Sequence, residues 1–265
     1  MHQSIQDLKS LYNKNTRQFR NKNIKRVIII LYINGYIGSG KSSLTEILSD
    51  TLGTPAYYEN VDDVPLLKSF YEEGGESRLD KSFKLQLDFL TYRYNQLRHA
   101  IIQHNSVLDS SLLSDGLMAG NLLKRGEFRQ EDFNLYQRIS VSMQKNIAGT
   151  PFNGAPDLIV FLDGSFDLML EHIQMRGRDM EVLDKDKIEY FHSVWETYTH
   201  WGESYFESPV VKIDIDKYDY VNNMSDRKEV LTQILTRMVE LGMLQEKEFE
   251  EIKVNKLDLL TDANS

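Results

Sequence analysis

Hydrophobic positions fall along the chain in short continuous runs, separated by longer stretches of helical spacing. The run from Val27 to Ile33, "VIIILYI", is almost wholly β-branched and aliphatic, as in a strand buried on both faces. Further strands are predicted at "AYYENV", "SVLD", "PDLIVFLDGS" and "PVVKIDI". Helical periodicity predicts helices at Ser42–Leu52, "FKLQLDFLTYRYNQLRHAIIQH", "EDFNLYQRISVSMQKNI", Asp167–Met175, Lys187–Trp201 and Ser225–Leu241. Strands separated by helices predict an α/β fold with a five-stranded parallel sheet flanked by helices.

A glycine-rich loop follows the first strand. Residues 33–44 read "INGYIGSGKSSL", in which Gly35-x-x-x-x-Gly40-Lys41-Ser42 has the spacing of a phosphate-binding P-loop. Glycines let backbone N–H groups converge on a phosphate, and the following helix N-terminus faces the anion. Lys41 would bridge the outer phosphates and Ser42 would complete a Mg²⁺ shell. The alternative is that this segment is an ordinary glycine turn before a helix and binds no phosphate.

The predicted ligand of this loop is a nucleoside triphosphate such as ATP, together with Mg²⁺. The residues expected to hold it are Gly35, Gly38, Ser39, Gly40, Lys41, Ser42 and Ser43.

Composition narrows the classes of function. With 265 residues, 41% hydrophobic and 27% charged, the chain can bury a full core. A net charge of −9 argues against a partner that is a DNA or RNA polymer, because such a surface must be positive. The longest apolar run is too short to cross a bilayer, which argues against a membrane partner. The absence of cysteine removes disulfides and thiolate metal sites, and it suits a cytoplasmic chain.

The two ends differ from the middle of the chain. Residues 1–25 are basic and polar, and residues 245–265 are charged and end in "TDANS". We expect a basic, polar N-terminal extension over 1–25, a P-loop domain over 26–244, and a charged C-terminal tail over 245–265. Both ends are expected to be frayed or additional to the core.

Carboxylates stand at the ends of three predicted strands: Glu59, Asp109 and Asp163. In a parallel α/β sheet, ligands bind at the carboxyl ends of the strands. Phosphoryl transfer to a hydroxyl needs one carboxylate to take the proton and another to hold Mg²⁺. Glu59 and Asp109 are predicted for these two roles; the alternative is that each only caps the following helix.

Two further segments carry polar side chains that could contact a substrate. On the long helix, Gln86 and Arg93 share an otherwise apolar face about 10 Å apart. An amide there can read a nucleobase edge, although a half-exposed helix edge explains the pair equally well. The segment "RGRDMEV" places Arg176 and Arg178 after a helix, as in a mobile lid that covers a transferring phosphoryl group. The alternative is a charged surface turn.

In combination these segments resemble one family. From about Arg26 to Leu244, the chain is similar to the bacterial deoxyribonucleoside kinases of the deoxyadenosine, deoxyguanosine and deoxycytidine kinase type. The resemblance is carried by "GYIGSGKSSL", "YYENVDD", "LQLDFLTYRY", "VLDSSLLSD", "PDLIVFLDGSF", "RGRDME" and "IDIDKYDYV", in the family's order. It implies Mg²⁺-dependent transfer of the γ-phosphoryl group of a nucleoside triphosphate to the 5′-hydroxyl of a deoxyribonucleoside.

The resemblance also implies roles for individual residues. Glu59 is implied to be the catalytic base, with Lys41 and the lid arginines Arg176 and Arg178 serving the phosphates. Ser42 and Asp109 are implied to serve the metal. The remaining roles fall on Gln86, Arg93 and Asp115 for the nucleobase, Tyr71 and Glu181 for the sugar 3′-hydroxyl, and Asp216 and Tyr218 in the loop "DIDKYD" that packs on the donor adenine, mainly through backbone.

Substrate and assembly follow from the same resemblance. Asp115 next to Arg93 favours a base with an exocyclic amine, hence deoxyadenosine, deoxyguanosine or deoxycytidine over thymidine. A homodimer is expected, or a heterodimer with a paralogue, with the long helix beginning at Phe83 as an interface element.

The chain departs from the family pattern after the third strand. Where the family has Asp/Glu-Arg-Ser, the chain has Asp109-Ser110-Ser111, and a serine supplies neither the charge nor the fork of donors. Asn60 stands where a proline is usual. Either another basic residue such as a lid arginine compensates, or the chain is a catalytically weak nucleotide-binding paralogue that regulates or partners another kinase subunit. A P-loop kinase acting on a nucleoside monophosphate is a third possibility.

Overall fold

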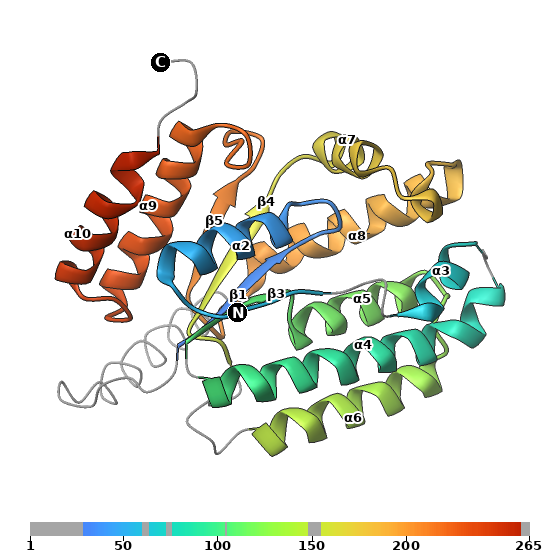
Figure 1. Ribbon diagram of the computed structural model, residues 1–265. Helices are drawn as coiled ribbons and strands as arrows, with labels where there is room; N and C mark the ends of the chain where they lie inside the picture. Colours follow the sequence, from blue (N-terminus) through green and yellow to red (C-terminus); the bar gives the residue numbers. More distant parts are fainter. Residues whose placement is uncertain (1–28, 60–63, 73–75, 104, 148–154, 261–265) are drawn as a thin grey trace, which may run out of the picture.

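Five short apolar strands form a parallel sheet at the centre of the molecule, in the order β2-β3-β1-β4-β5 (Figure 1). The computed structural model describes residues 29–59, 64–72, 76–103, 105–147 and 155–260. The strands are β1 Ile30–Gly35, β2 Ala56–Tyr57, β3 Ser106–Asp109, β4 Leu158–Asp163 and β5 Val210–Asp214. The parallel five-stranded sheet predicted from the sequence is confirmed.

Strand β1 occupies the middle of the sheet, and all six of its residues are buried, including the polar Asn34. It pairs with β3 on one side and β4 on the other, so that Leu31 lies between Val107 and Leu158. Its carboxyl end runs directly into the glycine-rich loop. A fully buried central strand therefore fixes the base of that loop.

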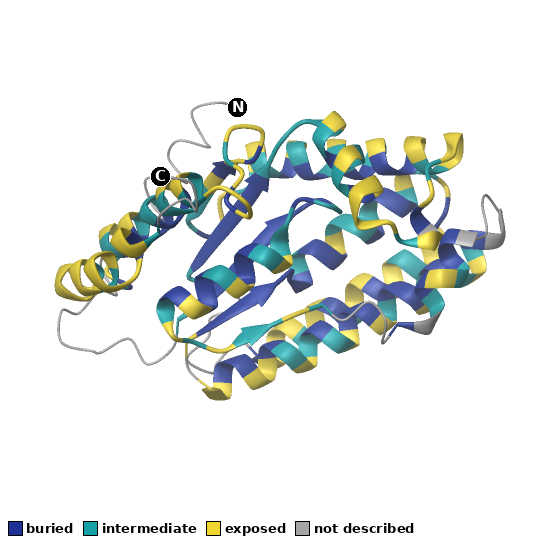
Figure 2. Ribbon diagram, turned by 45° about the horizontal axis from the view of Figure 1, so that its top comes forward, coloured by how far each residue is buried: buried dark blue, intermediate teal, exposed yellow. Residues whose placement is uncertain are grey.

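Helices flank the sheet (Figure 1). Their bounds are α2 Lys41–Leu52, α3 Pro65–Glu72, α4 Glu76–Gln103, α5 Leu112–Lys124, α6 Gln130–Ile147, α7 Phe166–Arg176, α8 Lys185–Ser204, α9 Met224–Glu240 and α10 Glu246–Asn255, with 3₁₀ turns η2 Asp179–Glu181 and η3 Leu257–Leu259. Figure 2 shows the central strands buried and the outer faces of the helices exposed, whereas the edge strand β2 is of intermediate burial. Helix α8 approaches β4 closely at Gly202, where a Cβ would lie 2.3 Å from the Phe161 ring.

The predicted elements differ from the observed ones in extent. Strand β2 has only two residues, and the long helix α4 begins at Glu76 instead of Phe83. Helices α3 and α5 were not predicted. The predicted extension over residues 1–25 lies outside the described residues, as does Asn60. Within the described residues, no helix combines the length and the apolar character that crossing a membrane requires.

The C-terminal segment folds back onto the body of the protein. Of the two alternatives expected for this end, frayed or additional to the core, residues 246–259 fit the second, since they form α10 and η3 and pack on α9. Leu257 is buried, with 1% of its surface exposed. The Nζ atom of Lys256 donates to the carbonyl oxygens of Asp50 and Thr51, at 2.5 and 3.0 Å. This contact caps the C-terminal end of α2, the helix that follows the glycine-rich loop.

Leu257→Ala is expected to lower the free energy of unfolding by about 2–5 kcal/mol, because it removes a buried side chain from the contact between this segment and the core. Leu259 lies in the same turn but is 70% exposed, so Leu259→Ala is expected to change stability by less than about 0.5 kcal/mol. Urea denaturation of both variants measures the difference. Equal, small effects would mean that the segment does not contribute to the fold.

Candidate active site

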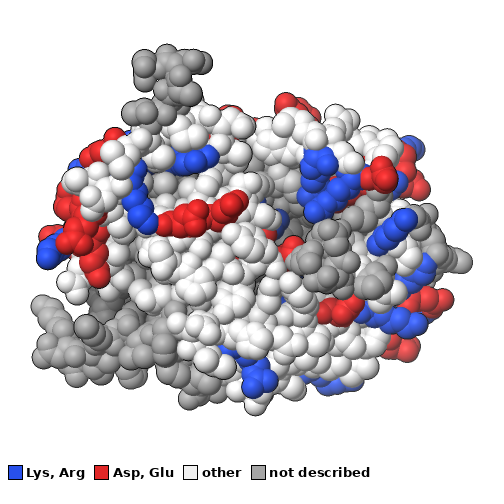
Figure 3. All heavy atoms as spheres, in the orientation of Figure 1, with Lys and Arg blue, Asp and Glu red and all other residues white. Residues whose placement is uncertain are grey.

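A cavity of about 820 Å³ lies at the carboxyl ends of β1 and β3. Of the predicted site residues, all but Gly35 line it, from the glycine-rich loop through Glu59, α4 and α5 to the lid and the loop after β5. On the face seen in Figure 3, acidic and basic side chains are interspersed without a broad basic area. The third strand-end carboxylate, Asp163, pairs instead with Lys212 at 2.6 Å.

The glycine-rich loop has the backbone that its glycines permit. Gly38 and Gly40 have φ angles of 81° and 87°, a region that other L-residues rarely adopt. A Cβ on Gly40 would also lie 2.5 Å from the Tyr220 hydroxyl oxygen, which donates to the Gly40 carbonyl at 3.0 Å. On the other side of the loop, His172 Nδ1 lies 2.8 Å from the Gly38 carbonyl oxygen. The loop is thus supported from α7 and from the segment after β5.

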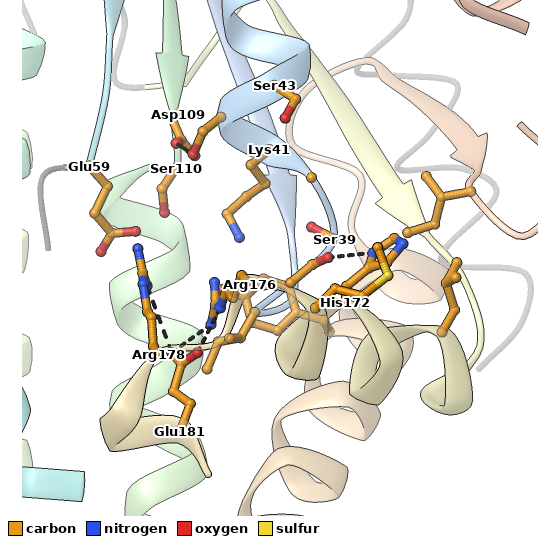
Figure 4. A pocket seen from close by; sticks show the side chains of 18 of the residues that line it. Ser39, Lys41, Ser43, Glu59, Asp109, Ser110, His172, Arg176, Arg178 and Glu181 are labelled. Carbon is orange, nitrogen blue, oxygen red and sulfur yellow. Dashed lines mark hydrogen bonds and ion pairs between the residues drawn. The ribbon is translucent and has the colours of Figure 1, made fainter. Parts of the chain in front are cut away.

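Lys41 points into the cavity from the start of α2 (Figure 4). Its Nζ donates to the Tyr36 carbonyl at 2.9 Å. Burial lowers the pKa of Lys41, and the carboxylates of Asp109 and Glu59 oppose that shift by favouring the charged ammonium. The cation is therefore held against nearby carboxylates, with donor capacity left for phosphate oxygens.

Two oxygen groups next to Lys41 suit a magnesium ion. The Ser42 hydroxyl donates to Oδ2 of Asp109, and Oδ1 of Asp109 is buried without a hydrogen-bond partner among the described residues. Burial raises the pKa of Asp109, while Lys41 and the hydrogen bond from Ser42 lower it. A carboxylate oxygen and a hydroxyl are the hard ligands that Mg²⁺ prefers, so the residues present fit the predicted metal.

On the opposite wall, α4 and α5 supply a polar cluster. Nη2 of Arg93 donates to Oε1 of Glu59 at 2.5 Å, and its Nη1 pairs with Oδ1 of Asp115. Gln86 is 3% exposed, and its Oε1 has no hydrogen-bond partner among the described residues. The same holds for Oδ2 of Asp115. Buried polar atoms without partners are costly, which marks these atoms as places where a ligand would supply the missing hydrogen bonds.

The lid arginines are engaged with an acid in this structure. Arg176 binds Glu181 through two hydrogen bonds of 2.6 Å, from Nε and Nη2, and Arg178 Nη1 lies 3.7 Å from the same carboxylate (Figure 4). Tyr71 lines the cavity nearby, and burial raises the pKa of its hydroxyl, which therefore stays protonated and able to donate.

In the loop after β5, Asp216 and Tyr218, the residues predicted for the donor nucleotide, line the cavity. The Asp216 carboxylate accepts hydrogen bonds from the backbone N–H and the hydroxyl of Ser165, both at 2.6 Å. The Tyr218 hydroxyl accepts from Gln233 at 3.3 Å. Because these side chains already bind protein groups, they are compatible with a ligand contact made through the backbone.

Sequence reasoning missed two cavity residues and could not place a third. Tyr220 and His172 support the glycine-rich loop. Tyr220 lies in the segment "IDIDKYDYV" but was given no role there, and His172 lies in none of the quoted segments. Ser110 lines the cavity with a φ of 77°, unusual for a residue other than glycine, and carries no charge.

The sheet order, the glycine-rich loop and the arginine-bearing lid together define an α/β P-loop kinase. Comparison with known proteins narrows this class. A family model described as deoxynucleoside kinase matches residues 31–240. The chain therefore belongs to the deoxynucleoside kinase family.

Individual relatives agree with the family. A deoxyguanosine kinase of Lactobacillus johnsonii is 37% identical over 219 residues, covering 82% of this chain and 96% of the relative. A deoxyadenosine kinase of Lactobacillus acidophilus is 35% identical over 220 residues, covering 82% and 100%. The solved deoxyadenosine kinase of M. mycoides, with dCMP and dCDP bound, has a TM-score of 0.63 at 24% identity, covering 82% of this chain and 100% of that chain. It supports the fold. None of these relatives is named as a regulatory paralogue.

Tyr220→Phe is expected to raise the KM for the nucleoside triphosphate roughly two- to tenfold, because it removes one hydrogen bond that holds the glycine-rich loop. Burial raises the pKa of the Tyr220 hydroxyl, so this group donates throughout the working pH range. Tyr205→Phe is the matched control, since its hydroxyl donates to Ser208 at 3.2 Å and the residue does not line the cavity. Initial rates at varied donor concentration measure both, and equal KM values for the two variants would contradict the assignment.

Proposed function

We propose that the protein transfers the γ-phosphoryl group of a nucleoside triphosphate to the 5′-hydroxyl of a purine deoxyribonucleoside. The observation that carries the proposal is one cavity that joins the glycine-rich loop to a wall with buried polar atoms that have no hydrogen-bond partner among the described residues. Family membership and relatives named as deoxyguanosine and deoxyadenosine kinases support the same reaction.

The donor side of the cavity holds the triphosphate. The backbone of the glycine-rich loop and Lys41 bind the phosphates, and the loop after β5 packs on the donor base. Ser42 and Asp109 would hold Mg²⁺, which neutralises charge on the phosphates when it is bound.

The acceptor side positions the nucleoside. Glu59 takes the proton of the 5′-hydroxyl as the hydroxyl oxygen bonds to the γ-phosphorus. The bond from that phosphorus to the β,γ-bridging oxygen breaks, and the nucleoside diphosphate leaves. Tyr71 and Glu181 bind the 3′-hydroxyl, and Gln86, Arg93 and Asp115 read the base. Oε1 of Gln86 and Oδ2 of Asp115, which have no hydrogen-bond partner among the described residues, are acceptors and match the N–H donors of adenine or guanine.

The lid completes the site when both substrates are bound. Arg176 and Arg178 turn from Glu181 toward the transferring phosphoryl group and offset its developing charge. In this proposal the sugar hydroxyl replaces the arginines as a partner of Glu181, so that acceptor binding favours lid closure.

The test is phosphoryl transfer from ATP and Mg²⁺ to each of the four deoxyribonucleosides, with the parent chain and Ser110→Arg in parallel. Robust turnover of deoxyguanosine or deoxyadenosine is expected from the parent chain. Measurable nucleotide binding without turnover, repaired by Ser110→Arg, would instead favour a regulatory paralogue. Turnover of nucleoside monophosphates alone would contradict the acceptor assignment.

A homodimer and a cytoplasmic location are further parts of the proposal. Analytical ultracentrifugation of the full chain decides the first. A single sedimenting species of about 31 kDa would contradict the dimer, since one chain has a mass of 30.9 kDa.

A further inference from the structure

Arg93 binds the carboxylates of two groups that serve different purposes in the site. One guanidinium nitrogen pairs with Asp115, a residue of the base-reading set, and the other donates to Glu59 at 2.5 Å. We infer that Arg93 is a positioning residue for Glu59, holding the carboxylate that accepts the proton of the acceptor hydroxyl. The inference rests on the proposed function, since it assumes that Glu59 is the base.

Glu59 has little local structure to hold it. It follows a two-residue strand at the edge of the sheet, and its side chain is 19% exposed. Among the described residues, Arg93 is the one hydrogen-bonded partner of its carboxylate. A side chain on an edge segment has several accessible rotamers, and each contact that restricts them reduces the entropy lost on reaching the reactive geometry.

Helix α4 also holds the backbone of the residue that precedes Glu59. The carbonyl oxygen of Tyr58 accepts hydrogen bonds from the Tyr92 hydroxyl at 3.2 Å and from Gln96 Nε2 at 2.6 Å. Tyr92, Arg93 and Gln96 lie within about one turn of the helix, so a single stretch of α4 holds both the backbone before Glu59 and its carboxylate. These contacts agree with a supporting role for this stretch.

Arg93 is itself rigidly placed. Its side chain is 9% exposed, and its guanidinium lies over the Phe89 ring with 5.0 Å between the guanidinium carbon and the ring centroid. Asp115, in the first turn of α5, is 1% exposed and fixes the far side of the guanidinium. Charge-assisted hydrogen bonds from a fixed, planar donor set the orientation of a carboxylate more firmly than a flexible lysine does.

No other described cation of the cavity is bound to Glu59. Lys41 donates to the Tyr36 carbonyl, and Arg176 and Arg178 pair with Glu181. Ser110, which lines the same cavity as Glu59, is neutral. Arg93 therefore provides the positive charge that a neutral residue at position 110 does not.

A positioning role of Arg93 and a role in base reading alone predict different kinetic effects of its replacement. An arginine that only reads the base affects nucleoside affinity, and its replacement leaves the rate at saturating nucleoside unchanged. An arginine that positions the catalytic base affects kcat, because a displacement of about 1 Å at a reacting group costs roughly 10²-fold in rate. Measuring kcat and nucleoside Kd of an Arg93 variant separately therefore distinguishes the two roles.

The experiment uses Arg93→Lys in the full chain, which keeps a positive charge beside Asp115 and limits the damage to folding. Nucleoside Kd is measured by calorimetry without donor, and kcat at saturating nucleoside and ATP. We expect kcat to fall roughly 10- to 100-fold, whatever happens to Kd. Arg98→Lys, an exposed arginine outside the cavity on the same helix, is the matched control and is expected to change neither quantity. An unchanged kcat for Arg93→Lys would overturn the inference.

A double-mutant cycle with Glu59→Gln provides the second measurement. If Arg93 acts through Glu59, Arg93→Lys lowers kcat in the parent chain and has almost no further effect in the Glu59→Gln chain. Effects that multiply would mean that Arg93 acts independently of Glu59, and the inference would be wrong. Thermal melting of each variant verifies that the compared chains are folded.

Failure of the inference and failure of the proposed function give different results. If Glu59→Gln keeps full activity, Glu59 is not the base, and the proposed mechanism is wrong. If Glu59→Gln loses activity while Arg93→Lys keeps the parent kcat, the mechanism stands and only the positioning role is lost.

Discussion

Glu59→Gln is expected to lower kcat for deoxyribonucleoside phosphorylation by about 10²- to 10⁴-fold, while the nucleoside still binds. An amide has nearly the same size as the carboxylate, and its oxygen can still accept the hydrogen bond from Arg93. It cannot take a proton from the 5′-hydroxyl. Steady-state rates together with nucleoside Kd from calorimetry measure the two effects separately.

The control for this change is another carboxylate at a strand end. Asp163 lies at the end of β4, pairs with Lys212 and does not line the cavity, so Asp163→Asn is expected to leave kcat unchanged. If Glu59→Gln lost nucleoside binding in proportion to its loss of rate, the residue would serve to bind the acceptor and not to accept its proton.

Lys41→Met is expected to lower kcat/KM for the donor by about 10²- to 10³-fold. The methionine fills similar space but removes the buried charge that faces Asp109 and Glu59, and with it the donors for phosphate oxygens. Rates at low donor concentration measure kcat/KM directly, and Lys124→Met, an exposed lysine on α5, is the control.

A loss confined to KM would limit the role of Lys41 to holding the triphosphate. A loss that includes kcat is the expected result, because charge develops on the phosphoryl group during transfer and the ammonium stabilises it. Retention of full activity by Lys41→Met would remove the glycine-rich loop from the mechanism.

Much of the fold is local enough to be predicted from the sequence. Strands β1 and β4 are continuous apolar runs because both faces of each are buried. Strand β2 is shorter than predicted since it lies at the edge and pairs with β3 alone. Helix α5 escaped prediction because Gly116 and Gly120 lower its intrinsic propensity, although its Ser111 cap marks its start. Packing against neighbouring helices compensates for the two glycines.

The site likewise contains features that the local sequence predicts and contacts that depend on the fold. The glycine-rich loop is one continuous segment, so its spacing was sufficient to predict it. The pairing of Arg93 with Glu59, 34 residues apart, depends on how the edge strand lies against α4, which no local pattern encodes. Likewise, the bond from Tyr220 to the carbonyl of Gly40 spans 180 residues. The resemblance to a family supplied the roles of Gln86 and Asp115, but not these supporting contacts.

The folded C-terminal segment has a consequence for how the protein opens. The family model ends at residue 240, yet Leu257 is buried and Lys256 caps α2, the helix that carries Lys41. Protection of backbone amides against hydrogen exchange should therefore extend through α10 and not stop with α9. Because opening of this segment uncaps α2, exchange in the two regions is expected to be coupled, and motion at the end of the chain is transmitted to the helix of the phosphate-binding loop.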